Sequence, residues 1–234
     1  MAATNMKIRF VIVVYLAFTA GGALTGLLAV YALDAGPLGA VFLSGRGEEL
    51  IRDVLFGVAA PLVLLVAWCK RPVADIGLVN TGVKKILVWA VIGVVVSFLQ
   101  VKLAMRVFTW PSYSWDSWRN GLDYLPLWGL VALRVLEIGI VSSVAQEVFF
   151  RGIFQRYAAQ RAGRVAGVLI TALFFAAWHH QLGRVLSYHA VTFGDQAVAG
   201  LILGYLYEKT GSLYTPILCH AAWNTYCVVS EMLF

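Results

Sequence analysis

Charged side chains are scarce in this 234-residue sequence: they make up 13% of the chain, while 61% of the residues are hydrophobic. The mean hydropathy of +0.81 lies well outside the usual range of soluble proteins. We therefore expect an integral, multi-pass membrane protein. At about 20 residues for each crossing, the chain has room for roughly six to eight spans and little left for a soluble domain.

Cysteine is also scarce, and Cys69, Cys219 and Cys227 show no CxxC spacing. A disulfide framework or a thiolate metal site is therefore not expected. The first apolar run is too long for a signal-peptide core, so we expect it to be retained. No long repeat, low-complexity tract or linker divides the chain. We predict a single membrane-embedded helical domain over residues 1–234.

Seven apolar runs predict an all-α fold, a polytopic transmembrane helical bundle of about seven spans. With the N-terminus inside, 11 of the 18 basic residues lie at the inner side, as the positive-inside rule expects. Because these residues lie between apolar runs, the net charge of +6 does not indicate nucleic-acid binding. The predicted spans are Phe10–Leu33, Val54–Trp68, Ile86–Val107, Leu127–Tyr157, Val165–Leu182, Ala190–Tyr207 and Leu213 to the C-terminus.

Two connectors and one contact face follow from local composition. Thr81–Lys85 is expected to be a loop before the third span, and Glu208–Ser212 a tight turn after the sixth. Gly200 and Gly204 have the small-xxx-small spacing that lets two helices approach closely. We therefore predict a helix contact at these glycines.

The fourth run contains the sequence QEVFFR, in which Glu147 and Arg151 are four residues apart. Charged groups at membrane depth cost roughly 2.5 to 3.5 kcal/mol each on insertion scales, so they need a partner or a function. On a helix these two side chains lie one above the other and can neutralise each other. Gln146 points about 100° away from Glu147, so its amide is expected to face another neighbour, such as a polar cavity. A purely structural ion pair is the alternative.

Two further polar clusters follow. His179 and His180 lie on the fifth run, and His220 and Asn224 lie one turn apart on the seventh. Phe175 and His179 also share a helix face. Because lipid offers polar groups no partners, we expect the three clusters to converge on a polar cavity inside the bundle.

In this order the clusters resemble the EExxxR, FxxxH and HxxxN motifs of the CPBP family of intramembrane proteases, which includes the CAAX prenyl endopeptidases and bacterial relatives. Here they are QEVFFR (146–151), FAAWH (175–179) and HAAWN (220–224). The resemblance defines a motif-bearing core at about 127–234. It implies a hydrolase of the bacterial cytoplasmic membrane that cuts a membrane-anchored protein or peptide near its end, in contact with membrane lipid.

The resemblance also implies a role for each motif residue. His179 matches the histidine that activates water, and His220 and Asn224 match the donors to the oxyanion. Peptide hydrolysis needs a base near the water and donors near the developing negative charge, so this division of roles is chemically reasonable. Glu147 is implied as a supporting acid that pairs with the arginine. The candidate catalytic residues are Gln146, Glu147, Arg151, His179, His220 and Asn224.

Gln146 departs from the family pattern, because it occupies the position of the first Glu. An amide does not accept a proton at neutral pH, and loss of a general base typically lowers the rate 10²- to 10⁴-fold. Three explanations are open: an engineered substitution that silences a protease, a natural protease in which Glu147 acts instead, or a non-catalytic scaffold or immunity-type relative.

Zinc is the alternative to a metal-free site, since catalytic zinc often takes His and carboxylate ligands. The sequence has no HExxH motif, and Asn224 is a poor zinc ligand but a good oxyanion donor. We therefore predict no metal and no other cofactor. The sequence indicates no oligomeric state.

Several charges outside the motifs are expected to form structural pairs or interface contacts. A transporter would instead use them as a relay, although the chain shows no inverted repeat. They are Arg134 with Glu137, Lys102 with Arg106, and Asp195.

Overall fold

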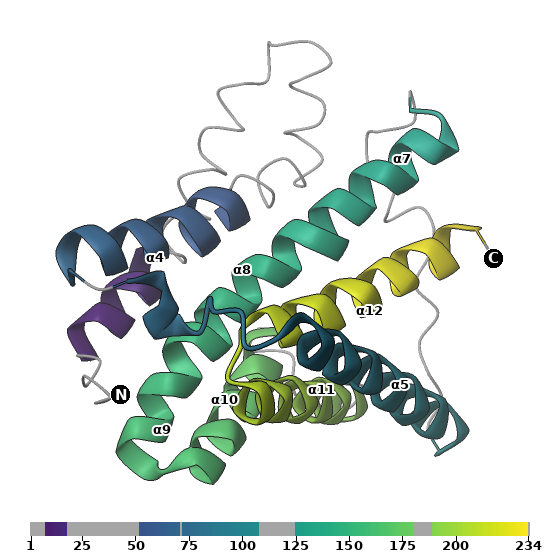
Figure 1. The fold of residues 1–234 in the computed structure, drawn as a ribbon. Coiled ribbons are helices and arrows are strands. Elements are labelled where there is room, and N and C mark those ends of the chain that lie inside the picture. The colour runs from purple at the N-terminus through teal and green to yellow at the C-terminus, as the bar shows by residue number, and fades with distance from the viewer. Residues whose placement is uncertain (1–7, 18–51, 71, 108–124, 180–188, 234) are drawn as a thin grey trace. The chain divides into compact units, whose positions relative to one another are not determined.

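The computed structural model describes residues 8–17, 52–70, 72–107, 125–179 and 189–233, and every regular element in these ranges is helical (Figure 1). The predicted all-α class is therefore confirmed. Most of the first predicted span lies outside the described residues, although residues 8–17 are helical. His180 also lies outside them.

The helices group into two compact units. The first unit consists of Met1–Val11, Pro72–Pro111 and Glu147–His220, and the second of Ile12–Arg71, Ser112–Gln146 and Ala221–Phe234. Three of the described helices contribute to both units, because the boundaries at 11/12, 146/147 and 220/221 fall inside them. The single domain predicted from the sequence stays a prediction.

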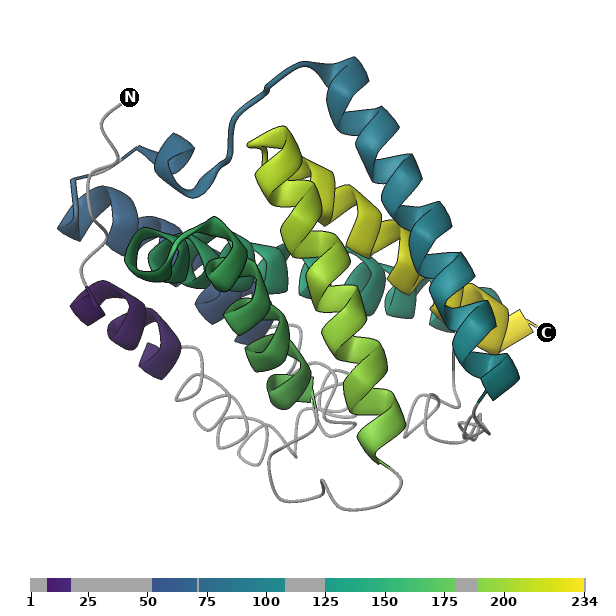
Figure 2. The same cartoon turned by 90° about the horizontal axis from the view of Figure 1, so that it is seen from below.

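In the first unit, three helices pack side by side: α5 (Val83–Val107), α10 (Arg164–His179) and α11 (His189–Thr210). Figure 2 shows α11 between α10 and α5. A Cβ atom on Gly200 would lie 2.8 Å from Cα of Ala172 in α10, so only glycine permits this approach of α11 to α10. The helix contact predicted at Gly200 is confirmed.

A short segment before α5 is hydrogen-bonded to the turn between α11 and α12 (Tyr214–Leu233). It contains a 3₁₀ turn, η4 (Val73–Ile76), which ends at Gly77 with a φ of +89°, a conformation that favours glycine. The carbonyl of Gly77 accepts a hydrogen bond of 2.7 Å from the N–H of Leu213. This contact fixes the start of α12 within the first unit.

The remaining helix of the first unit is the second half of a 36-residue helix, Leu127–Ala162. Here it consists of η6 (Val148–Gln155), which has π-helical turns, and α9 (Arg156–Ala162). A Cβ atom on Gly167 of α10 would lie 2.7 Å from the backbone nitrogen of Ala159. Glycine thus brings α9 and α10 into direct backbone contact.

The second unit contains the first half of the same helix: α7 (Leu127–Arg134), η5 (Val135–Ser142) and α8 (Ser143–Glu147), whose last residue belongs to the first unit. It also contains the C-terminal part of α12 and a helical run of η2 (Arg52–Ala59), α4 (Ala60–Val63) and η3 (Leu64–Trp68). Leu130 and Val131 of α7 pack with Val228 and Met232 of α12. These four side chains form an apolar core.

Three predicted boundaries differ from the structure. Residues 83–85 of the predicted loop are already helical in α5, residues 208–210 of the predicted turn still belong to α11, and the fourth run continues to Ala162. Hydropathy marks only the apolar part of a helix, whereas the backbone hydrogen bonds continue into polar residues. Lys85 is such a polar residue, in the first turn of α5. Its Nζ donates a hydrogen bond of 3.0 Å to the carbonyl of Thr210, the last residue of α11.

Two of the described helices are long and apolar enough to cross a membrane, namely Val83–Ala104 and Leu127–Ala162. They belong to the third and fourth predicted spans. The count of seven spans stays a prediction.

Candidate active site

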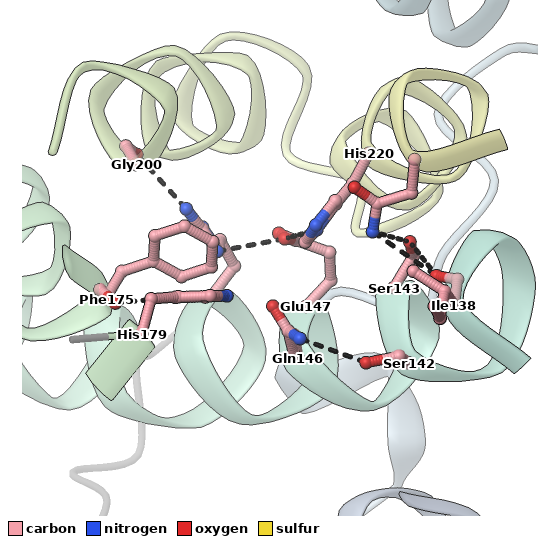
Figure 3. Close-up of polar contacts among 11 residues, drawn as sticks. Ile138, Ser142, Ser143, Gln146, Glu147, Phe175, His179, Gly200 and His220 are labelled. Atoms are coloured by element: carbon pink, nitrogen blue, oxygen red, sulfur yellow. Dashed lines mark hydrogen bonds and ion pairs between the residues drawn. The ribbon is translucent and has the colours of Figure 1, made fainter. Parts of the chain in front are cut away.

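The centre of the candidate site in the first unit is Glu147, whose side chain is fully buried. Its Oε1 accepts a hydrogen bond of 2.9 Å from Nη1 of Arg151, one turn further along the helix. Nδ1 of His220, on α12, lies 2.7 Å from the same oxygen (Figure 3). The other oxygen, Oε2, is buried and has no hydrogen-bond partner among the described residues. The predicted Glu147–Arg151 pair is confirmed, and an imidazole joins it.

Arg151 connects this pair to two more helices. Its Nη2 donates a hydrogen bond of 3.2 Å to the carbonyl of Gly200 in α11 (Figure 3). Its guanidinium carbon lies 4.5 Å from the centroid of the Phe175 ring in α10, a distance at which the negative face of the ring attracts the cation. The guanidinium is buried, and these contacts together with Glu147 replace part of the water that it gives up. Its Nε has no hydrogen-bond partner among the described residues.

Phe175 brings the second motif to the cluster. Its carbonyl lies 2.8 Å from Nδ1 of His179, one turn further along α10. The centroid of its ring is 4.3 Å from that of His179 and 5.9 Å from that of His220. If Nδ1 of His179 donates to the carbonyl, the neutral ring has its lone pair on Nε2, which makes that nitrogen the proton acceptor. His179 is exposed at the end of α10.

The two remaining candidates belong to the second unit. Nδ2 of Asn224 donates to the carbonyl of Ile138 at 3.3 Å and to Oγ of Ser143 at 3.1 Å. Nε2 of Gln146 donates to Oγ of Ser142 at 3.0 Å, so its amide nitrogen has a partner on its own helix, and the polar cavity expected near this amide stays a prediction. The sequence reasoning missed both serines, although Ser142 is four residues before Gln146 and shares its helix face.

The structure therefore joins four of the six predicted residues. Glu147, Arg151 and His220 are in direct contact, and the ring of Phe175 contacts the rings of His179 and His220. Gln146 and Asn224 lie in the second unit. One cavity shared by all six residues stays a prediction.

Arg134 with Glu137, and Asp195, form contacts of the expected structural kind, whereas the role of Lys102 with Arg106 stays a prediction. Nη1 of Arg134 lies 2.7 Å from Oε2 of Glu137, and both side chains are buried. Nε2 of Gln100 donates to Oδ1 of Asp195, which links α5 to α11. Among the residues that the structure describes, no group of three or more His, Cys, Asp or Glu side chains is arranged to hold a metal ion. The zinc alternative stays untested.

A buried carboxylate that holds an imidazole, in a chain with helices apolar enough to cross a membrane, is an arrangement suited to a membrane hydrolase. Comparison with known families agrees with this class. Residues 127–226 match the family described as type II CAAX prenyl endopeptidase Rce1-like. The resemblance predicted from the three motifs is therefore confirmed over this segment. The match, together with the two apolar helices, indicates a membrane protein.

Two curated proteins of Bacillus subtilis (strain 168) are similar to parts of the chain. "Putative membrane peptidase YdiL" is 26% identical over 102 residues, which are 44% of this chain and 38% of that protein. "Uncharacterized protein YpbD" is 26% identical over 130 residues, 55% of this chain and 61% of that protein. The chain thus covers less than two thirds of the length of either relative. No solved structure matches the chain.

Proposed function

We propose that this chain is an endopeptidase that hydrolyses a peptide bond near the end of a membrane-tethered protein. The observation that supports this most strongly is the contact of Glu147 with both Arg151 and His220 inside the segment that matches the protease family. A structural ion pair requires the acid and the arginine but no imidazole. The imidazole adds an N–H group that can stabilise a developing negative charge.

The proposed reaction begins with water. His179 accepts a proton at Nε2 while the water oxygen attacks the carbonyl carbon of the peptide bond. The carbonyl oxygen then becomes an oxyanion. His220 stabilises it by a hydrogen bond from Nε2, and because Nδ1 donates to Glu147, the ring carries a proton on both nitrogens in this step. When the C–N bond breaks, His179 returns its proton to the leaving amine, so that water is divided between the two products.

In this proposal Glu147 and Arg151 position groups without exchanging protons themselves. The carboxylate accepts from Nδ1 of His220, which fixes the orientation of the ring and directs Nε2 away from Glu147. Arg151 balances the charge of the carboxylate in a buried place. The family resemblance adds Asn224 as a second oxyanion donor, a role that we carry over as part of the proposal.

Gln146 makes the proposed enzyme slow. The family resemblance implies a glutamate at this position that polarises the water together with His179. The amide of Gln146 cannot take up a proton, and loss of such a base typically lowers the rate 10²- to 10⁴-fold. The test is cleavage of a membrane-tethered peptide in liposomes by the original chain, by Gln146→Glu, and by Gln146→Glu combined with His179→Ala. We expect Gln146→Glu to raise the rate by this factor and the added His179→Ala to abolish the gain. If all three proteins fold and none of them cleaves, the proposal is wrong.

Zinc is tested in the same assay. The proposed mechanism uses only side chains of the chain, so treatment with a strong zinc chelator should leave the rate of Gln146→Glu unchanged. A loss of cleavage that added zinc restores would instead support the Glu and His side chains as metal ligands.

The second candidate function is a non-catalytic membrane scaffold or immunity-type factor. The observation that favours it is the amide of Gln146, which donates to Ser142 and leaves its position without an acid. In that case Gln146→Glu would change neither cleavage nor any phenotype, and substitutions on the surfaces that contact a partner would matter instead.

A further inference from the structure

We propose that Gln155 is a positioning residue, which fixes the register of η6 against α11 and thereby holds Arg151 and Glu147 in place. No motif of the family resemblance includes this residue. The inference rests on the proposed function, because it concerns the same site.

Gln155 and Arg151 make matching contacts with α11. Nε2 of Gln155 donates a hydrogen bond of 3.1 Å to the carbonyl of Gly204, and Nη2 of Arg151 donates one of 3.2 Å to the carbonyl of Gly200. The two donors are one helical turn apart on η6, and the two acceptors are one turn apart on α11. Both side chains are fully buried, so the two bonds form away from water and depend on the alignment of the helices.

The absence of a side chain at Gly204 makes room for Gln155. A Cβ atom at this position would lie 2.8 Å from Oε1 of Gln155 and 3.1 Å from Cγ1 of Val168, closer than side chains normally pack. A side chain at 204 would therefore push Gln155 away from the backbone of α11. By contrast, a Cβ atom on Gly194 of the same helix would meet no atom within 4 Å, which provides a matched control.

Glu208 explains why the residue is an amide. Nε2 of Gln155 also lies 3.1 Å from Oε1 of Glu208, one further turn along α11. An amide nitrogen has two hydrogens, so Gln155 can serve both acceptors. A carboxylate at 155 would repel Glu208, and an apolar side chain would leave Glu208 and the buried carbonyl of Gly204 without this donor.

The register matters because Arg151 and Glu147 are on the same continuous helix as Gln155, one and two turns away. If η6 shifts along α11, Arg151 moves relative to Gly200, and Glu147 moves relative to Nδ1 of His220. A misplacement of about 1 Å can lower a rate about 100-fold. Gln155 therefore acts on the chemistry through Arg151 and Glu147, without touching the reacting atoms.

The experiment uses the full chain in detergent micelles, labelled with ¹⁵N in the histidine rings, with the His220 signals assigned from a His220→Gln sample. Gln155→Leu and Gly204→Ala are compared with the original chain and with Gly194→Ala. We expect the first two to shift the Nδ1 signal of His220 and Gly194→Ala to leave it in place. In the Gln146→Glu background, Gln155→Leu should lower kcat about 10- to 100-fold with little change in KM.

The two proposals fail in different ways. If Gln155→Leu is folded and its His220 signals overlay those of the original chain, or if Gly194→Ala shifts them as much as Gly204→Ala, the role of Gln155 is refuted. If the signals shift as expected but Gln146→Glu cleaves nothing, Gln155 positions the cluster and the proposed function is wrong. Should Gln155→Leu not fold, Gln155→Asn takes its place, because it keeps the amide but is one methylene shorter. A shift of the His220 signals in this variant supports the role of Gln155, and unchanged signals refute it.

Discussion

Two buried acid–arginine pairs lie on one helix, and they differ in what else they contact. Arg134 and Glu137 are three residues apart, with 2.7 Å between Nη1 and Oε2. Glu147 and Arg151 are four apart at 2.9 Å, but this pair also binds Nδ1 of His220 and the carbonyl of Gly200. An ion pair stabilises a helix in an apolar environment, and the imidazole that contacts Glu147 adds a group that can take part in a reaction.

The largest expected effect separates the two pairs directly. Glu147→Gln and Glu137→Gln each remove a carboxylate that pairs with a buried arginine, and breaking a buried pair typically costs about 3–5 kcal/mol of stability. We expect both variants to unfold more easily in detergent. In the Gln146→Glu background, however, only Glu147→Gln should abolish cleavage per folded molecule. Equal loss of cleavage in both would mean that the two pairs have the same, structural role.

The next effect concerns Asn224 in the second unit. If this amide stabilises the oxyanion, Asn224→Ala lowers kcat about 10²- to 10³-fold, as removal of one such donor does. Ser143→Ala, which removes an acceptor for the same amide, should have a smaller effect because the side chain of Asn224 is kept. The measurement is kcat and KM in the Gln146→Glu background. Unchanged kcat in Asn224→Ala would remove this residue from the mechanism.

Packing next to each pair gives a smaller effect. A Cβ atom on Gly200 would lie 2.8 Å from the backbone of Ala172, and one on Gly139 would lie 2.5 Å from Oγ1 of Thr225. Overpacking of this kind typically costs 1–3 kcal/mol. Backbone relaxes less easily than a side chain, so we expect Gly200→Ala to lower the thermal unfolding midpoint more than Gly139→Ala. The reverse order would show that α10 and α11 can separate freely at this point.

The smallest effect is expected at the surface. Nε of Arg164 lies 3.9 Å from Oε2 of Glu208, and its side chain is 86% exposed. Exposed ion pairs contribute about 0–1 kcal/mol, and salt screens them. Arg164→Ala should therefore change neither the unfolding midpoint measurably nor the rate of cleavage. A clear fall in the unfolding midpoint or in the rate of cleavage would mean that the positive charge of Arg164 stabilises the contact between Glu208 and Gln155 more than its exposure suggests.

Much of the local structure could be predicted from the sequence. Apolar runs indicated the helices, and the i, i+4 spacing of Glu147 and Arg151 indicated their ion pair, because both depend on residues close together in the chain. The spacing of Gly200 and Gly204 likewise indicated a helix contact. Local periodicity is sufficient for features of this kind.

The contacts between helices could not be predicted in the same way. Periodicity places His220 on a face of its helix but does not say that Glu147 of a distant helix meets that face. The bond from Arg151 to the carbonyl of Gly200 has no signal in residue type, since every residue has a carbonyl. The partner of Gln146 could not be predicted either. Its amide nitrogen donates to Ser142 of its own helix, and local bonds of this kind compete with contacts to other helices.

The most direct test of the central claim is a double-mutant cycle on Glu147 and His220. Cleavage of a membrane-tethered peptide is measured for Gln146→Glu alone and with Glu147→Gln, His220→Gln or both, at equal concentrations of folded protein. Residues that act as one catalytic unit are strongly non-additive, so we predict that each single substitution lowers kcat about as much as the two together. If the losses multiply instead, or if neither substitution lowers kcat, the buried carboxylate and imidazole do not work as a unit and the account is contradicted.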